Sequence, residues 1–167
     1  MLLEVKKCSL LVVDVQERLL PAMTEPNRVV ERTGQLLDAA ARLGVPVTIS
    51  EQYPKGLGPT VAPLQRNDAL TFSKLAFSCW REAEMKQHFI DLHETDRPLV
   101  AITGIEAHVC VLQTALDLRS AGFGVFVVAD ATSSRQQTSV DLAHNRLRDA
   151  GVQLVSTEMV MFEWRGQ

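Results

Sequence analysis

The chain has 167 residues, a formal net charge of −3, 46% hydrophobic residues and 22% charged residues. This length suits one domain, residues 1–167, with a core of its own, and the ordinary charged fraction excludes a disordered acidic tail or a coiled coil. The slight acidity argues against nucleic acid as a partner, because duplex binders need a basic face. We expect no membrane span and no signal peptide. The odd count of three cysteines indicates thiols in a reducing, cytoplasmic compartment.

Apolar runs alternate with amphipathic stretches along the chain, which predicts an α/β fold with a mainly parallel sheet covered by helices on both faces. Expected strands occupy residues 8–14, 45–50, 69–72, 99–103, 123–129 and 152–155. Expected helices occupy residues 27–43, 82–92, 107–121 and 137–150. Stretch 53–63 is rich in Gly and Pro and is expected to be a loop, and 159–164 is a short apolar tail.

Cys110 stands where a strand turns into a helix, so we expect it in the first helical turn. The partial positive charge and free N–H groups of a helix N-terminus favour a thiolate and can lower the pKa of a cysteine below about 8.5. The same N–H groups can hold an oxyanion. The alternative is a small buried core residue, and position alone does not decide between the two.

Three further polar residues fall at strand ends, where ligands bind in open parallel sheets. Asp14 leaves a buried strand, where a carboxylate needs a partner, although a turn or cap role fits its position equally well. Lys74 can hold Asp14 charged and stabilise a thiolate, although for a lysine taken alone a solvated surface charge is the favoured interpretation. We expect Asp130 to be a turn or capping residue.

No histidine pair has the spacing of metal ligands, so we expect no metal and no cofactor. Cys8 and Cys79 are expected to line the core or a pocket. The pair Gly56 and Gly58 follows the second predicted strand and lacks the further glycine of a dinucleotide loop, so it is a very weak nucleotide signal.

Together, four segments in chain order resemble those of a known family. Leu-Val-Val-Asp-Val-Gln at 11–16 and Phe-Ser-Lys-Leu-Ala-Phe-Ser-Cys at 72–79 are similar to its first strand and its Lys segment. Thr-Gly-Ile-Glu-Ala-His-Val-Cys-Val-Leu-Gln-Thr-Ala at 103–115 is similar to its nucleophile segment, and Val-Val-Ala-Asp-Ala-Thr-Ser-Ser at 127–134 to its fifth strand. By these segments the chain resembles the isochorismatase-like cysteine hydrolases, over nearly its whole length.

The resemblance implies a three-layer α/β/α, Rossmann-like fold with a six-stranded parallel sheet of order 3-2-1-4-5-6. That order places Asp14 and Cys110 across the crevice where the strand order reverses. The resemblance also implies a catalytic triad of Asp14, Lys74 and Cys110. It further implies a cis peptide bond between Ile105 and Glu106 that turns the Glu106 N–H, with the Cys110 N–H, into an oxyanion hole.

The implied reaction is hydrolysis of a small molecule. Asp14 takes the thiol proton, Cys110 attacks a carbonyl carbon, and Asp14 then protonates the leaving amine and activates water. Nicotinamidases carry an Asp-x-His metal motif after strand two, and residues 50–58 of this chain have no histidine there. Isochorismatases cleave a vinyl ether without needing a thiol, so the presence of Cys110 favours amide-like C–N chemistry. The loop at 51–58 is most similar to a metal-free branch, the isochorismatase domain-containing hydrolases.

Substrate contacts and competing functions stay open at this point. We expect Gln16, Glu51, Tyr53, Phe77 and Trp80 to line the substrate pocket; the aromatic residues fit a subunit contact as well, and Glu51 fits a pair with Lys55 or Lys74. Alternative functions are hydrolysis of an ester or enol ether, or a thiol redox or binding protein without turnover, for which no resolving cysteine lies nearby in sequence. The apolar tail at 159–162 suggests a homo-oligomer.

Overall fold

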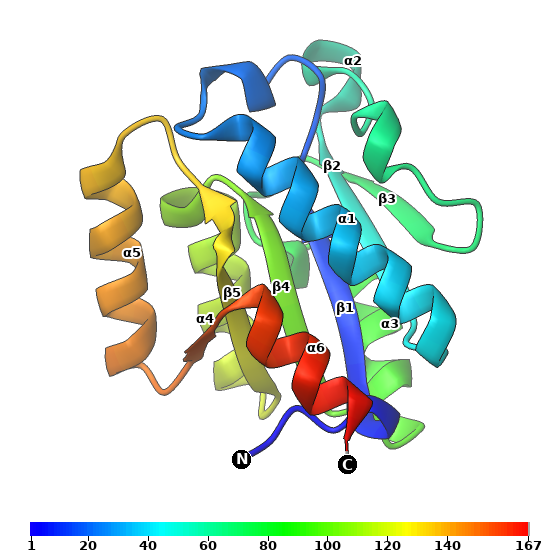
Figure 1. Ribbon diagram of the computed structural model, residues 1–167. Coiled ribbons are helices and arrows are strands. Elements are labelled where there is room, and N and C mark those ends of the chain that lie inside the picture. The colour runs from blue at the N-terminus through cyan, green and yellow to red at the C-terminus, as the bar shows by residue number, and fades with distance from the viewer. Residues whose placement is uncertain (167) are drawn as a thin grey trace.

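Six parallel strands form the centre of the molecule in the order β3-β2-β1-β4-β5-β6 (Figure 1). The computed structural model describes residues 1–166. The strands are β1 Cys8–Val13, β2 Val47–Gln52, β3 Leu70–Lys74, β4 Leu99–Ile105, β5 Gly124–Ser133 and β6 Gln153–Val155. The predicted fold class and strand order are confirmed.

Helices cover both faces of the sheet, as Figure 1 shows. On one face lie α1 (Pro26–Leu43) and α6 (Thr157–Arg165). On the other face lie three helices, α3 Ala83–Glu94, α4 Leu112–Ser120 and α5 Gln137–Asp149. The short helix α2 (Pro54–Leu57) follows β2 within the stretch expected to be a loop. Among the helices of residues 1–166, none combines the length and apolar character of a membrane span.

Strand β1 is apolar on both faces because it packs between the two helical layers. Leu10 and Val12 belong to the core beneath α1 and α6, whereas Leu11 and Val13 belong to the core beneath α3 and α4. Burying each such side chain contributes roughly 1.5–3 kcal/mol. This burial holds the end of β1, and the residue that follows it, in a fixed place.

The chain end differs from the prediction, because the expected tail is helix α6. Ser156 begins this helix by accepting a hydrogen bond from the Met159 N–H at 3.1 Å. Asp130 supports the same helix start, since its Oδ1 accepts from the Thr157 N–H at 2.8 Å and from the Thr157 hydroxyl at 2.9 Å. Asp130 therefore has a structural role, as expected, but it lies inside β5 and not in a turn after the strand.

Candidate active site

The strand order reverses between β1 and β4, which lie side by side with Val13 opposite Gly104. The two backbones approach closely here, because a Cβ atom on Gly104 would overlap the Val13 carbonyl oxygen. Asp14 follows β1 directly, with a left-handed backbone at φ 54°. Cys110 lies in the turn after β4, so the fold brings both residues to the crevice where parallel sheets bind ligands.

Asp14 and Lys74 form a buried ion pair at this point. Nζ of Lys74 lies 3.0 Å from Oδ2 of Asp14, and both side chains are 0% exposed. The Ser50 hydroxyl donates to the other carboxylate oxygen at 2.7 Å. Burial lowers the pKa of Lys74, but the opposing charge of Asp14 and the neighbouring thiol groups outweigh it, so the pKa is raised overall. Lys74 is therefore a fixed cation.

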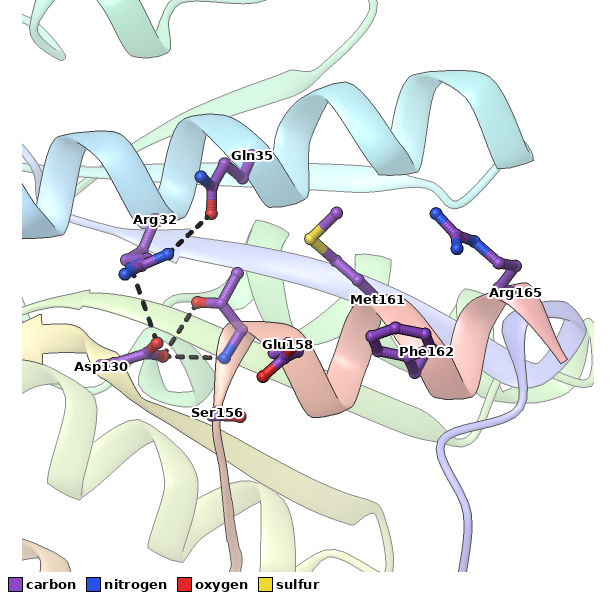
Figure 2. A pocket seen from close by; sticks show the side chains of 9 residues that line it. Arg32, Gln35, Asp130, Ser156, Glu158, Met161, Phe162 and Arg165 are labelled. Carbon is purple, nitrogen blue, oxygen red and sulfur yellow. Dashed lines mark hydrogen bonds and ion pairs between the residues drawn. The ribbon is translucent and has the colours of Figure 1, made fainter.

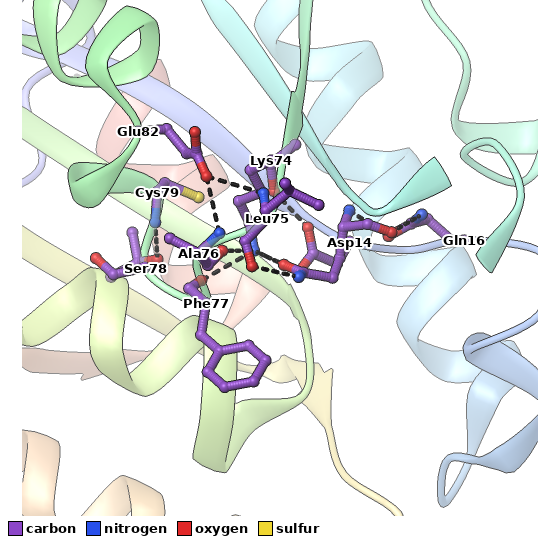
Figure 3. Close-up of polar contacts among 12 residues, drawn as sticks. Asp14, Gln16, Lys74, Leu75, Ala76, Phe77, Ser78, Cys79 and Glu82 are labelled. Atoms are coloured by element: carbon purple, nitrogen blue, oxygen red, sulfur yellow. Dashed lines mark hydrogen bonds and ion pairs between the residues drawn. The ribbon is translucent and has the colours of Figure 1, made fainter. Parts of the chain in front are cut away.

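The Lys74 ammonium is enclosed by oxygen acceptors. Besides its ion pair with Asp14, it donates to Oε1 of Gln52 at 2.6 Å and to the carbonyl oxygens of Phe77 at 2.9 Å and Ala76 at 3.1 Å (Figure 3). The loop that supplies these carbonyls is braced by Glu82, whose carboxylate accepts from its backbone N–H groups. An ammonium with acceptors on every side is held in place and stays charged.

Cys110 sits in a π-helical turn, Ala107–Val111, where the Val111 N–H donates to the Glu106 carbonyl at 3.2 Å. Burial, and next the negative charge of Asp14, raise the pKa of the Cys110 thiol, and Lys74 offsets them only in part. Burial and Asp14 therefore outweigh any lowering of this pKa that the helix N-terminus can give. A raised pKa favours the protonated thiol, and Asp14 is the nearby carboxylate that contributes to it.

Glu106 has separate backbone and side-chain surroundings. The peptide bond between Ile105 and Glu106 is cis. The Glu106 carboxylate accepts from the backbone N–H and from Nε of Arg135, each at 3.1 Å. The side chain thus braces the loop after β5.

Two of the expected substrate contacts have other roles. The carboxamide of Gln16 is buried and bonded to the backbone of Gln52 and to the Gly58 carbonyl, so it is unable to reach a substrate. The Glu51 carboxylate accepts from the N–H of Thr60 at 2.5 Å and from its hydroxyl at 2.7 Å, and pairs with neither expected lysine. Strand alternation explains this, because residues 50 and 52 face the ion pair and residue 51 faces away.

The three aromatic residues expected to line the substrate pocket lie in different places. Trp80 packs edge-on against Phe123, with ring centroids 5.6 Å apart, and lines a cavity near the end of α3, so its predicted place at the site is wrong. Tyr53 and Phe77 are each 52% exposed. Tyr53 shares a cavity of about 460 Å³ with Lys74, whereas the Phe77 ring points away from the ion pair in Figure 3.

Two cavities are lined by site residues or their neighbours, and neither is lined by Cys110. Tyr53 and Lys74 line the first, and His108, Arg135, Gln136 and Ser139 line the second, of about 330 Å³. Cys110 itself is 5% exposed. A larger cavity, of about 480 Å³, lies between α1 and α6 on the other face of the sheet (Figure 2).

The other thiols lie in the core, and all three cysteines are free. Cys8 and Cys79 are fully buried. Cys79 nevertheless lies near the site, because Asp14 and Lys74 both act on its thiol; burial first, then Asp14, raises its pKa to about 11. In the part of the chain that the structure describes, no three His, Cys, Asp or Glu side chains are grouped so as to hold a metal ion.

Ser50 and Gln52 are the site residues that sequence reasoning missed. Both contact the ion pair, and both lie on the face of β2 that also carries the buried Thr48. The signal was present, because Thr48, Ser50 and Gln52 alternate with their neighbours along a strand. Polar side chains repeating on one face of a buried strand indicate partners inside the protein.

Comparison with known proteins decides the family. The family model described as isochorismatase domain matches residues 8–159. The chain belongs to the isochorismatase family of hydrolases. It is 38% identical to isochorismatase domain-containing protein 2 of Danio rerio over 161 residues, covering 96% of this chain and 80% of that protein.

Solved structures of this family share the fold closely. MAR1 ribonuclease from Caenorhabditis elegans superimposes with a TM-score of 0.92 at 33% identity, over 100% of this chain and 85% of that one. The YcaC gene product of Escherichia coli, an octameric hydrolase of unknown specificity, has a TM-score of 0.91 at 27% identity, over 99% of this chain and 82% of that one. YcaC from Pseudomonas aeruginosa, with hexane-2,5-diol and covalent acrylamide, has a TM-score of 0.91 at 25% identity, over 98% of this chain and 83% of that one.

Proposed function

We propose that this isochorismatase-family protein is a cysteine hydrolase that cleaves an amide-like C–N bond in a small molecule. The observation that carries the proposal is the buried pair of Asp14 and Lys74, whose charges both act on the Cys110 thiol. A carboxylate, a fixed cation and a protonated thiol in one crevice are the parts that nucleophilic catalysis by sulfur needs. The covalent acrylamide in YcaC from Pseudomonas aeruginosa supports the presence of a reactive nucleophile in that related protein, since acrylamide is attacked at its carbon–carbon double bond.

In the proposed steps Asp14 carries two protons in turn, first that of the thiol and then that of water. Asp14 takes the thiol proton as the Cys110 sulfur forms a bond to the carbonyl carbon, and the oxyanion accepts hydrogen bonds from the Glu106 and Cys110 N–H groups. Asp14 then gives the proton to the leaving nitrogen as the C–N bond breaks. Water then gives a proton to Asp14 as its oxygen bonds to the acyl carbon, the C–S bond breaks, and Asp14 returns this proton to the Cys110 sulfur. Lys74 keeps its proton throughout and balances the negative charge.

The raised pKa of Cys110 fits this order of events. A thiol that is mostly protonated at rest reacts slowly with electrophiles, and proton transfer to the adjacent Asp14 generates the nucleophile during reaction. With 5% of Cys110 exposed, turnover requires a local opening at this end of the sheet. An ester or enol ether is the alternative electrophile, because the same parts serve it equally.

A substrate panel tests the proposal. Small amides, esters, enol ethers and a short RNA are incubated with wild type, Cys110→Ala, Asp14→Asn and Cys8→Ala, and products are identified by mass spectrometry. RNA is included because one structural neighbour is a ribonuclease. Cys110→Ala and Asp14→Asn should lower turnover of the small molecules at least about a hundredfold, while Cys8→Ala, a buried thiol on the other face, stays active. Full turnover by Cys110→Ala overturns the nucleophile role.

A thiol redox or binding role is the second candidate, since Cys79 lies near the same charges as Cys110. It predicts reversible oxidation of Cys110 and no acyl intermediate. The raised pKa of both thiols counts against it, because oxidation follows thiolate character. The three free thiols also suit the cytoplasmic location that we propose.

We also propose that the chain forms homo-oligomers through the exposed face of α6. Met159 and Phe162 are 54% and 60% exposed, and they lie between Glu158 and Arg165, two helical turns apart. In an antiparallel pair of α6 helices, Glu158 of one copy meets Arg165 of the other, and the two apolar side chains meet in the middle. Figure 2 shows Phe162 beside the cavity between α1 and α6, which offers room for the partner's side chains. The octameric neighbour supports self-association in the family.

A further inference from the structure

We infer that Gln52 is a positioning residue that keeps Lys74 charged and aimed at Asp14, and that Gln16 fixes Gln52 in that place. The inference rests on the proposed function, because it concerns the cation that balances the charge of the Cys110 thiolate. Neither residue touches the reacting atoms. Both act through Lys74.

The Gln52 carboxamide makes the shortest contact of the Lys74 ammonium, with Oε1 at 2.6 Å from Nζ. Its other end is also fixed, since Nε2 donates to the Leu75 carbonyl at 2.8 Å. Rotating the amide by half a turn would place an NH₂ group against the ammonium and an oxygen against a carbonyl oxygen. Only the observed orientation satisfies both partners, so the amide has one stable position.

Gln16 holds the backbone of Gln52 from the end of β1. Its Oε1 accepts from the Gln52 N–H at 2.7 Å, and its Nε2 donates to the Gln52 carbonyl at 2.9 Å. The side chain therefore reproduces the pairing of a neighbouring strand beyond the point where β1 ends. A second bond, from Nε2 to the Gly58 carbonyl at 2.8 Å, ties the following loop to the same group.

The consequence for Lys74 follows from its burial. A fully buried ammonium stays charged only while acceptors replace water, and burial is already the largest influence on its pKa, in the lowering direction. Losing the Gln52 oxygen lowers the pKa of Lys74 and loosens its position. Because the Lys74 charge lowers the pKa of Cys110, that loss raises the pKa of the thiol further.

Alkylation of Cys110 tests this without a substrate. Iodoacetamide is applied to folded protein at several values between about pH 7 and 10, the range that brackets the free thiol pKa of about 8.5, and modification of each cysteine is followed by peptide mass spectrometry. Gln52→Met keeps the side-chain length and removes the acceptor. We expect Cys110 in this variant to react about tenfold more slowly at each pH, which corresponds to a rise of about one pKa unit.

Gln65→Met is the matched control, because Gln65 Nε2 donates to the Thr60 carbonyl at 2.8 Å and its side chain makes no contact with Lys74 in residues 1–166. It should react at the wild-type rate. A general loosening of the fold gives the opposite result, with faster alkylation that also reaches the buried Cys8 and Cys79, and would overturn the positioning role.

Two further variants separate the possible failures. Gln52→Asn shortens the side chain and withdraws the oxygen, so it repeats the test if Gln52→Met does not fold. Wild-type rates in every folded Gln52 variant, alongside slower alkylation in Lys74→Met, overturn the role of Gln52 and leave the proposed function standing. An unchanged rate in Lys74→Met itself contradicts the charge balance in the proposed function.

Discussion

The ammonium of Lys74 lies 3.0 Å from the carboxylate of Asp14, and neither side chain reaches solvent. The two residues come from strand ends that are far apart in sequence, and β2 lies between their strands in the sheet. A buried ion pair is not an efficient way to stabilise a fold, because desolvation of two charges offsets their attraction. Its presence at the reversal of strand order is better explained by the chemistry proposed for this site.

Removing one partner of this pair should be costly. Lys74→Met leaves the Asp14 carboxylate buried without its cation, so we expect a loss of about 3–5 kcal/mol in the free energy of unfolding. The double variant Asp14→Asn, Lys74→Met should lose less than the sum of the two single variants. Urea denaturation at neutral pH measures all three. Additivity within about 0.5 kcal/mol would show that the two side chains do not interact.

Stability should fall at alkaline pH because of the buried thiols. Burial raises the pKa of Cys8 from 9.0 to about 12. Below pH 9 the thiol is protonated in both states and its contribution is fully present; as pH rises toward 12 only the unfolded chain releases the proton, so stability is lost. In that pH window each such thiol lowers the free energy of unfolding by about 1.4 kcal/mol per pH unit.

Cys8→Ala isolates this contribution. Between about pH 9 and 10.5 the unfolding free energy of the variant should decline less steeply than that of wild type. The difference in slope should be about 1.4 kcal/mol per pH unit, which is what one proton contributes. Urea denaturation at intervals of pH provides the slope for both proteins. Parallel curves for wild type and Cys8→Ala would mean that the thiol titrates alike in both states.

Charge reversal on α6 should control self-association. Glu158→Lys and Arg165→Glu each place like charges opposite one another in the antiparallel pair, so each variant alone should dissociate at concentrations where wild type is associated. Mixed together, the two variants restore opposite charges at both contacts and should associate. Sedimentation velocity on each variant and on the mixture measures this. Wild-type assembly in both single variants would locate the interface elsewhere.

Much of the fold followed from the chain itself, and the reasons differ between elements. The double-sided burial of β1 predicted a central strand, while the strand order came from the family resemblance. Helix α6 was missed, although Ser156 is a good cap and Val160 and Trp164 have helical spacing, because the segment is short and ends the chain.

The site was predictable only as far as local rules reach. Asp14, Lys74 and Cys110 were singled out at strand ends, but the raised pKa of Cys110 depends on burial, which no local pattern reports. Alternation along β2 would have assigned Ser50 and Gln52 to the ion pair and Glu51 to the opposite face. The direction of Trp80, by contrast, is set by packing against Phe123, which is distant in sequence.

The reactivity of Cys110 is the claim on which the proposed function depends, and one measurement addresses it directly. Native protein is incubated with acrylamide, a small amide electrophile, and the modified peptide is identified by mass spectrometry. The account predicts one adduct, on Cys110, with Cys8 and Cys79 unmodified. An unmodified Cys110 in protein that is otherwise folded, or an adduct only on the other thiols, would contradict the account.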